Sequence, residues 1–364
     1  MSADQLLIAL MALFAVLGAL DRIFGGRFGI GKEFESGILT MGSLALAMVG
    51  IVCLAPVLAA VLRPVVVPVY RILGADAAMF AGSILACDMG GGALARELTQ
   101  NADAAALGGV ITGSMLGATV VFTIPVAMGI LDEGDRPAMA KGILCGIITI
   151  PVGVLAGGLV AGFPLGMVAQ NLIPIVILAA LIALGLWRAE RAMVRGFELF
   201  GKGVVAVSTA GLAAAIVQSL TGWAIIPGMA PIADGFQTVG SIAIVLAGAF
   251  PLVAILTRLL QKPLLAAGRH LGINDVAAAG LIASLANSIA TFGMVKDMNP
   301  RGKVVNIAFA VSAAFVFGDH LGFTAGFAPE LLPAVILGKL SGGVSAVIVA
   351  LLLTAKEEES EKRS

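Results

Sequence analysis

Residues Arg71–Asp76 read RILGAD, and residues Arg269–Asn274 read RHLGIN, 198 positions further along the chain. Other residues recur at the same offset without a gap: Gly42-Ser43 and Gly240-Ser241, Gly50 and Gly248, Gly82 and Gly280, Ser114 and Ser312, and Lys141 and Lys339. One fixed offset across many positions indicates an internal duplication. In a membrane protein such a repeat is typical of transporters, whose substrate site lies where the two halves meet.

The composition identifies a membrane protein. Mean hydropathy is +1.06, 59% of the 364 residues are apolar and 12% are charged, against roughly 25% charged in soluble domains. A helix needs about 20 apolar residues to cross a bilayer. Apolar segments of suitable length lie near residues 5–20, 38–62, 77–94, 104–131, 138–162, 165–187, 203–226, 239–261, 275–294, 302–319 and 331–354. Their unbroken hydrophobicity predicts an all-α polytopic protein with about 9–11 transmembrane segments.

Loop charges predict the orientation of the segments. If all eleven segments cross, the loop Lys and Arg residues divide 11 against 10 between the two sides, without the usual cytoplasmic excess. If segments 77–94 and 275–294 enter and return on the same side, the division becomes 18 against 3. The second arrangement places the C-terminal tail in the cytoplasm and the loops near 163–165, 227–238 and 320–329 outside.

This second arrangement also makes the two halves antiparallel. Each half then has four crossings and one re-entrant or broken-helix element, as in inverted-repeat transporters. We predict a first transmembrane repeat at 1–164, a linking helix and cytoplasmic loop at 165–202, a second repeat at 203–354 and a charged cytoplasmic tail at 355–364. A parallel repeat with eleven full crossings is the alternative.

The first re-entrant element carries an acidic residue in an apolar context. Asp88 precedes Gly90, Gly91 and Gly92, and each glycine costs a helix about 1 kcal/mol relative to alanine. A helix break would place backbone groups beside the carboxylate, which is tolerated at membrane depth where the backbone lines a cavity. Asp88, Gly90 and Gly91 are therefore candidate substrate-binding residues. The alternative is that Asp88 caps a helix near the interface.

The second element is polar but uncharged. Asn287 is the nearest counterpart of Asp88, one place from the exact offset, and Ser288 follows it. A site with one acidic and one neutral polar half suits a substrate with a cationic end and a hydroxyl end. The alternative is that these side chains form helix–helix hydrogen bonds.

Three other charged residues are predicted close to the membrane interior. Asp319 ends the run FVFGD, and Lys339 lies inside the last apolar segment. A buried lysine needs a partner, and Asp88 or Asp319 could supply it. Lys141, the repeat mate of Lys339, begins an apolar segment. We consider Asp319 a substrate-binding candidate and the two lysines candidates for coupling or counter-ion roles, with interfacial positions as the alternative for Asp319 and Lys141.

The chain lacks the sequence motifs of several functional classes. The chain contains no GxxxxGK[ST] phosphate loop, no HExxH or Cys/His metal cluster and no GxSxG elbow. The three cysteines are scattered, and the basic stretch from Arg188 to Lys202 is too sparse for nucleic-acid binding. We therefore expect neither an enzyme nor a resident cofactor, metal or nucleic acid.

Three stretches resemble the bacterial ethanolamine utilisation permease family, EutH. They are FGGRFGIGKEF at 24–34, MGSLALAMVG at 41–50 followed by Leu54-Ala-Pro56, and AMFAGSILACDMGG at 78–91. The resemblance covers most of the chain, and the Asp-Met-Gly-Gly run is its most specific part. It implies a multi-pass inner-membrane permease that supplies ethanolamine to cytoplasmic catabolism.

The residues and the resemblance fit together chemically. A carboxylate such as Asp88 would hold an ammonium by a charge-assisted hydrogen bond, while Asn287 and Ser288 would take the hydroxyl of protonated ethanolamine. A carrier for another small cation, amino alcohol or amino acid remains the alternative, and a membrane scaffold or receptor is a remote one. The glycine-rich helix faces also leave room for a homodimer.

Overall fold

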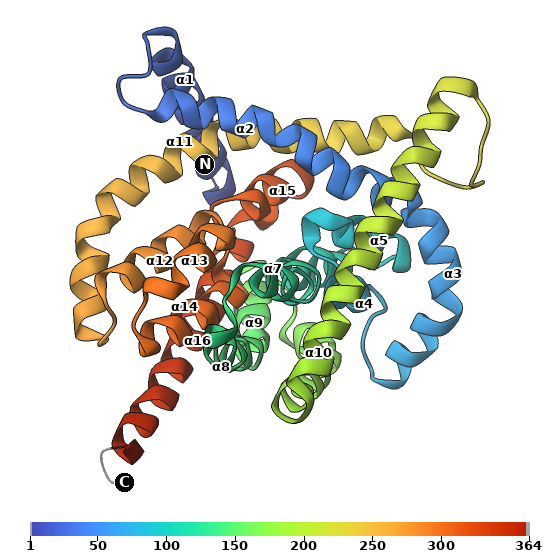
Figure 1. The fold of residues 1–364 in the computed structure, drawn as a ribbon. Coiled ribbons are helices and arrows are strands. Elements are labelled where there is room, and N and C mark those ends of the chain that lie inside the picture. The colour runs from blue at the N-terminus through green and yellow to red at the C-terminus, as the bar shows by residue number, and fades with distance from the viewer. Residues whose placement is uncertain (1, 362–364) are drawn as a thin grey trace.

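The computed structural model describes residues 2–361, which form helices and contain no strand. Figure 1 shows the long helices α10 and α11, and the run from α2 into α3, lying around shorter helices such as α4, α5, α12, α13 and α15. The helices are α1 (Ala3–Ile23), α2 (Ile30–Leu44), α3 (Gly50–Ile72), α4 (Ala78–Ile84), α5 (Gly91–Leu98), α6 (Ala102–Ala105), α7 (Ile124–Ile130), α8 (Arg136–Ile147), α9 (Ile150–Val160), α10 (Leu165–Thr221), α11 (Ile232–His270), α12 (Asp275–Ala286), α13 (Ser288–Met294), α14 (Pro300–Ala313), α15 (Asp319–Phe327) and α16 (Leu332–Glu361).

Shorter helical turns and π-helical stretches connect these elements. The π-helical stretches are η1 (Ala45–Val49), η3 (Ala106–Gly117) and η4 (Thr119–Thr123), and the 3₁₀ turns are η2 (Cys87–Met89), η5 (Glu133–Asp135), η6 (Val295–Asp297) and η7 (Pro329–Leu331). π-helical turns inside α-helices occur frequently at functional sites. The π-helical stretch η3 is therefore a candidate neighbour of the substrate site.

Eight helical spans within the described residues are long and apolar enough to cross a membrane, which confirms the all-α membrane class. They are Ala3–Ile23, Ile30–Ile72, Ala102–Ile130, Glu133–Val160, Leu165–Ala189, Arg191–Thr221, Ile232–Leu259 and Pro329–Ala355. Within the span Ala102–Ile130, 83% of the 18-residue apolar window is buried inside the protein. The other spans therefore surround it, and its residues face protein on nearly every side.

The three remaining apolar segments of the sequence contain interrupted helices. Segment 77–94 holds α4, η2 and the start of α5, and segment 275–294 holds α12 and α13 with a break at Asn287. Segment 302–319 was expected to be continuous, but α14 ends at Ala313 and α15 begins at Asp319. Broken helices are the usual places for transporter substrate sites. The re-entrant course and the inverted orientation of the halves remain predictions.

One loop assignment requires correction. Residues 188–202 were predicted to form a cytoplasmic loop, but α10 includes them: two helices meet at a kink at Ala189 (φ −144°, ψ 48°), and the second continues to Thr221. Arg, Ala, Glu and Met are good helix formers, so the charged stretch begins a second helix instead of forming a loop. The tail predicted at 355–364 continues α16 as far as Glu361, and residues 362–364 lie outside the described part.

Close helix contacts recur at the sequence offset of 198. A Cβ at Gly82 would lie 1.8 Å from the Gly108 carbonyl oxygen, and a Cβ at Gly280, its repeat mate, would lie 2.4 Å from Oδ1 of Asn306, which is the mate of Gly108. Both pairs therefore need glycine for the same close approach between helices. The duplication is thus visible in the packing contacts as well as in the residue identities.

A second recurrent contact links the two halves. A Cβ at Gly50 would lie 1.7 Å from the carbonyl oxygen of Ser208, and one at Gly248 would lie 2.0 Å from that of Met11. Ser208 and Met11 match the offset to within one residue. The first helix of each predicted half therefore packs against a glycine of the other half, so the halves are interleaved.

The predicted orientation can be tested by cysteine labelling. Asp234 and Arg195 are exposed, on opposite predicted sides of the membrane, while the native Cys53, Cys87 and Cys145 are buried. We expect a membrane-impermeant maleimide to label Asp234→Cys in intact cells, and Arg195→Cys only after permeabilisation. The wild-type chain is the background control, and the opposite labelling pattern would overturn the orientation.

Candidate substrate site

Asp88 lies where the chain is interrupted between α4 and α5. Leu85 and Ala86 are extended, η2 carries Asp88, and Gly90 adopts a left-handed conformation (φ 92°) before α5 begins. A Cβ at Gly90 would lie 2.0 Å from Cγ2 of Ile51. The run of glycines therefore both breaks the helix and allows α3 to pack against the break.

A second interruption brings α15 to the same place. Phe315, between α14 and α15, is the one non-glycine residue with positive φ (62°) in the described chain. Its N–H donates to the carbonyl of Ser284 (3.0 Å), and that of Phe317 donates to Leu285 (2.9 Å). Pairing with the end of α12 satisfies the exposed backbone inside the protein, as membrane depth requires. A bulky residue held at positive φ is strained, and such strain is concentrated at functional sites.

The two interruptions border a cavity of about 800 Å³. Asp88, Asp319 and His320 line it together with Phe122 and Phe315. The other lining residues are largely apolar: Ser43, Leu44, Ala47, Ala86, Met89, Ala118, Val121, Pro125, Val126, Met128, Gly129, Arg136, Glu198, Gly201, Lys202 and Val205. A mostly apolar cavity with a few convergent polar groups is the usual form of a small-molecule site.

The cavity joins a buried end to an exposed end. The side chains of Asp88 and His320 are 13% and 4% exposed, whereas those of Glu198 and Lys202 at the other end are 46% and 70% exposed and form an ion pair of 2.6 Å. Arg136 also lines the cavity, with 40% of its side chain exposed. The loop-charge count assigns these three residues to the cytoplasmic side, so the cavity opens toward the predicted cytoplasm.

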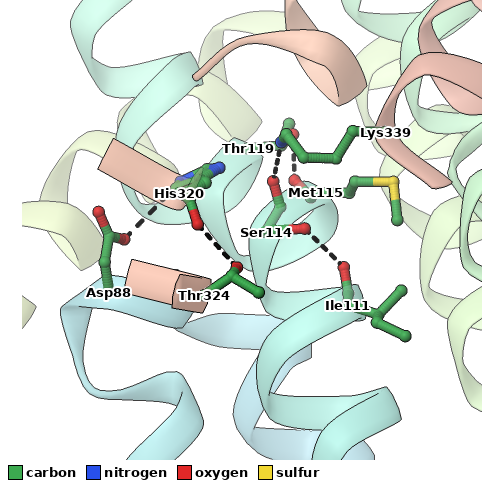
Figure 2. Close-up of polar contacts among 8 residues, drawn as sticks. All are labelled: Asp88, Ile111, Ser114, Met115, Thr119, His320, Thr324 and Lys339. Atoms are coloured by element: carbon green, nitrogen blue, oxygen red, sulfur yellow. Dashed lines mark hydrogen bonds and ion pairs between the residues drawn. The ribbon is translucent and has the colours of Figure 1, made fainter. Parts of the chain in front are cut away.

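His320 faces Asp88 across the buried end, as Figure 2 shows. The Nε2 atom of His320 lies 3.7 Å from Oδ1 of Asp88, beyond the range of a direct hydrogen bond. The imidazole contacts the ring of Phe315 at a centroid distance of 5.2 Å, and that ring meets Phe122 edge-on at 5.5 Å. The carboxylate is therefore bordered by an imidazole and two aromatic rings.

Lys339 is buried beside this cavity, with 1% of its surface exposed. Its Nζ donates a hydrogen bond to the backbone carbonyl of Ser114 in η3 (Figure 2). The sequence suggested Asp88 or Asp319 as its partner. The hydrogen-bond partner is instead a carbonyl oxygen, although the ammonium lies within electrostatic range of Asp88. Lys339 thus places its amino group within electrostatic range of Asp88 without lining the cavity.

The remaining predicted site residues lie elsewhere. The Asn287 side chain accepts a hydrogen bond from the Ile289 N–H, and Ser288 is buried; neither lines the cavity. Gly90 and Gly91 shape the break beside Asp88 and are likewise absent from the cavity wall. Lys141 borders a different pocket with Asp135, so the two repeat-related lysines do not share a site.

His320 is the site residue that sequence reasoning missed. The chain has two histidines, and this one follows directly after Asp319. The expected membrane segment ended at Asp319, which left His320 in a loop. A histidine adjacent to a membrane carboxylate, in a chain so poor in histidine, was the available signal.

Asp88 and His320, together with the neighbouring Cys87, form one cluster of potential metal ligands among the described residues. Single donor atoms of Cys87, Asp88 and His320 lie within 4.8 Å of one another. Lys339 opposes a metal ion because its ammonium lies within electrostatic range of both Cys87 and Asp88. We therefore interpret this cluster as the polar end of the cavity and assign no metal or cofactor to it.

Comparisons with known proteins agree on one family. The family model described as "Ethanolamine utilisation protein, EutH" matches residues 3–353. The chain is 57% identical to a "Probable ethanolamine permease EutH" from Listeria monocytogenes, with 100% of this chain and 97% of that protein aligned. It is 48% identical to the protein of the same name from Escherichia coli (100% and 98%), and 50% identical to an "Uncharacterized protein YxeR" from Bacillus subtilis (100% and 98%). No solved structure matches the chain. By full-length similarity, then, this chain belongs to the EutH family of ethanolamine utilisation proteins.

Proposed function

We propose that this chain is an ethanolamine permease of the bacterial inner membrane and that it carries the protonated form of its substrate. The relatives named as probable ethanolamine permeases support the transport of ethanolamine. The observation that carries the proposal further is the buried end of the cavity, where two carboxylates meet an imidazole. The proposal includes no catalytic step.

Formal charges at the buried end favour a monocation. With all three groups ionised, Asp88 and Asp319 carry two negative charges and Lys339 one positive charge, which gives a sum of minus one. A buried charge is costly unless it is paired. The ammonium group of protonated ethanolamine supplies the missing positive charge, whereas an anion or a neutral solute would leave the site unbalanced.

The shape of the cavity supports alternating access. Its charged end is buried between interrupted helices, and its other end reaches exposed Glu198 and Lys202. In this conformation the substrate would exchange with the predicted cytoplasm. Transport then requires a second conformation, in which the helices around α4, α5 and α15 close this path and open one to the outside.

Competition for uptake tests the substrate class. In proteoliposomes containing the purified protein, we expect saturable uptake of labelled ethanolamine that unlabelled ethanolamine inhibits strongly. Choline should inhibit at least about tenfold more weakly, because its quaternary nitrogen has no N–H to donate to Asp88. Equal inhibition by choline or by small amino acids would favour a broader cation or amino-acid carrier, and absence of saturable uptake would favour a scaffold.

Lys339 leads to a prediction about coupling. An ammonium fixed against the Ser114 carbonyl occupies the kind of position that a coupling cation would take. We expect uptake to be the same within about twofold when external Na⁺ is replaced by K⁺. We also expect Lys339→Met to lower uptake by at least about tenfold, because it removes the amino group that lies within electrostatic range of Asp88. Uptake driven by a Na⁺ gradient in the wild type would contradict this role.

A further inference from the structure

We propose that His320 binds the hydroxyl group of the substrate, so that the site selects β-amino alcohols over simple primary amines. The inference rests on the proposed function, in which Asp88 holds the ammonium end. It assigns to His320 the role that the sequence suggested for Asn287 and Ser288, which lie outside the cavity lining.

The His320 imidazole is buried without a hydrogen bond. The residue is 3% exposed, its Nδ1 has no partner among the described residues, and its Nε2 is 3.7 Å from the nearest carboxylate oxygen. Nearly all buried polar groups in proteins are hydrogen-bonded, and an unmade bond costs about 1–3 kcal/mol. Nε2 is the ring nitrogen that faces Asp88, and His320 lines the cavity, so Nε2 is the atom that a molecule in the cavity can pair.

The gap between the two side chains matches the substrate. Carbon–nitrogen and carbon–carbon bonds of about 1.5 Å place the nitrogen and oxygen of a folded two-carbon amino alcohol roughly 3 Å apart. The ammonium can then donate a hydrogen bond to Oδ1 of Asp88 while the hydroxyl bonds to Nε2 of His320. The molecule bridges the two side chains, whose facing atoms are 3.7 Å apart. A single ethanolamine molecule could therefore contact both groups at once, whereas ethylamine could contact only Asp88.

The ring is also held in place before the substrate arrives. His320 is the second residue of α15, whose start is positioned by the backbone hydrogen bonds of Phe315 and Phe317 to the end of α12. The Phe315 ring contacts the imidazole directly. Ser43 is the other neutral polar side chain on the cavity wall; it is exposed, and its hydroxyl already donates a hydrogen bond to the Thr40 carbonyl. Among neutral polar groups on the wall, His320 is thus the one that faces Asp88.

Two substitutions of matched length test this assignment. His320→Gln keeps an amide near the position of Nε2, and His320→Met keeps the length but removes the hydrogen bond. We expect the wild type to prefer ethanolamine to ethylamine by at least about tenfold, since a site built to bind a hydroxyl rejects the analogue that lacks it. His320→Gln should retain most of this preference, and His320→Met should reduce it to within about threefold of unity.

The measured quantity is the ratio of apparent affinities, so lower expression of a variant does not affect it. Competition in proteoliposomes gives the ratio for active variants, and ligand-dependent thermal stabilisation of the purified protein gives it for variants that bind without transport. Equal loss of preference in both variants, or an unchanged preference in His320→Met, would overturn the role of His320. Asp88→Asn should instead weaken both amines together, so failure of the proposed function is distinguishable from failure of this inference.

Discussion

Replacing Asp88 by asparagine is expected to lower saturable ethanolamine uptake by at least about thirtyfold. The substitution keeps the shape of the side chain but removes the charge that pairs with the substrate ammonium. Truncating one partner of a buried charge pair costs about 2–5 kcal/mol, and 2 kcal/mol already corresponds to about thirtyfold in affinity. The measurement is initial uptake of labelled ethanolamine at mildly acidic external pH, where little neutral amine is available to diffuse through the lipid.

Two control variants make this result specific. Asp103→Asn removes an exposed carboxylate at the start of the neighbouring helical span and should leave uptake unchanged. Asp319→Asn removes the second carboxylate of the cavity and should weaken uptake, less strongly than Asp88→Asn if Asp88 makes the direct contact. Saturable uptake that survives in a well-expressed Asp88→Asn variant would remove this residue from the site.

The sequence was sufficient to predict the elements with strong composition signals. Eight long apolar segments and the glycine run after Asp88 are explained by transfer of side chains to lipid and by the low helix propensity of glycine. Both depend on neighbouring residues only. Asp88 and Asp319 could each be proposed as a candidate because acidic residues are rare in membrane segments and each one is costly.

The arrangement of the polar side chains could not be predicted in the same way. The break between α14 and α15 contains no proline, and its one residue with positive φ is Phe315. It depends on hydrogen bonds to Ser284 and Leu285, which lie about 30 residues away. Tertiary contacts therefore overrode the local pattern of apolar residues. Because a continuous segment was expected at 302–319, the position of His320 in the cavity wall could not be foreseen.

The repeat had a similar limit. The offset of 198 relates close contacts such as Gly82 with the Gly108 backbone and Gly280 with the Asn306 side chain, where a Cβ on either glycine would clash. It does not relate the polar groups, since Asp88 lines the cavity and Asn287 caps α13. Duplication preserves packing more readily than it preserves a single asymmetric substrate site, which needs different groups from each half.

Replacing Gly90 by alanine is expected to destabilise the protein and to abolish uptake, although Gly90 contacts no substrate. At φ 92° an alanine incurs about 1–2 kcal/mol of backbone strain. Its Cβ would also lie 2.0 Å from Cγ2 of Ile51, and overpacking of this kind costs about 1–3 kcal/mol. Both effects displace η2, which carries Asp88. Thermal unfolding of the purified variant and ethanolamine uptake are the two measurements.

A double-mutant cycle with Ile51→Ala separates the two causes. Removing Cγ2 relieves the closest contact but leaves the Ile51 Cβ position 2.7 Å from the new methyl group, and it leaves the backbone strain unchanged. Ile51→Ala should therefore cost less in the Gly90→Ala background than in the wild type, with a coupling energy of about 0.5–3 kcal/mol. Additive losses would show that the Cγ2 contact does not contribute and that backbone strain and the remaining Cβ contact explain the effect. Normal stability and uptake in Gly90→Ala itself would contradict the close packing of α3 against the break, and with it the geometry that holds Asp88 in the cavity.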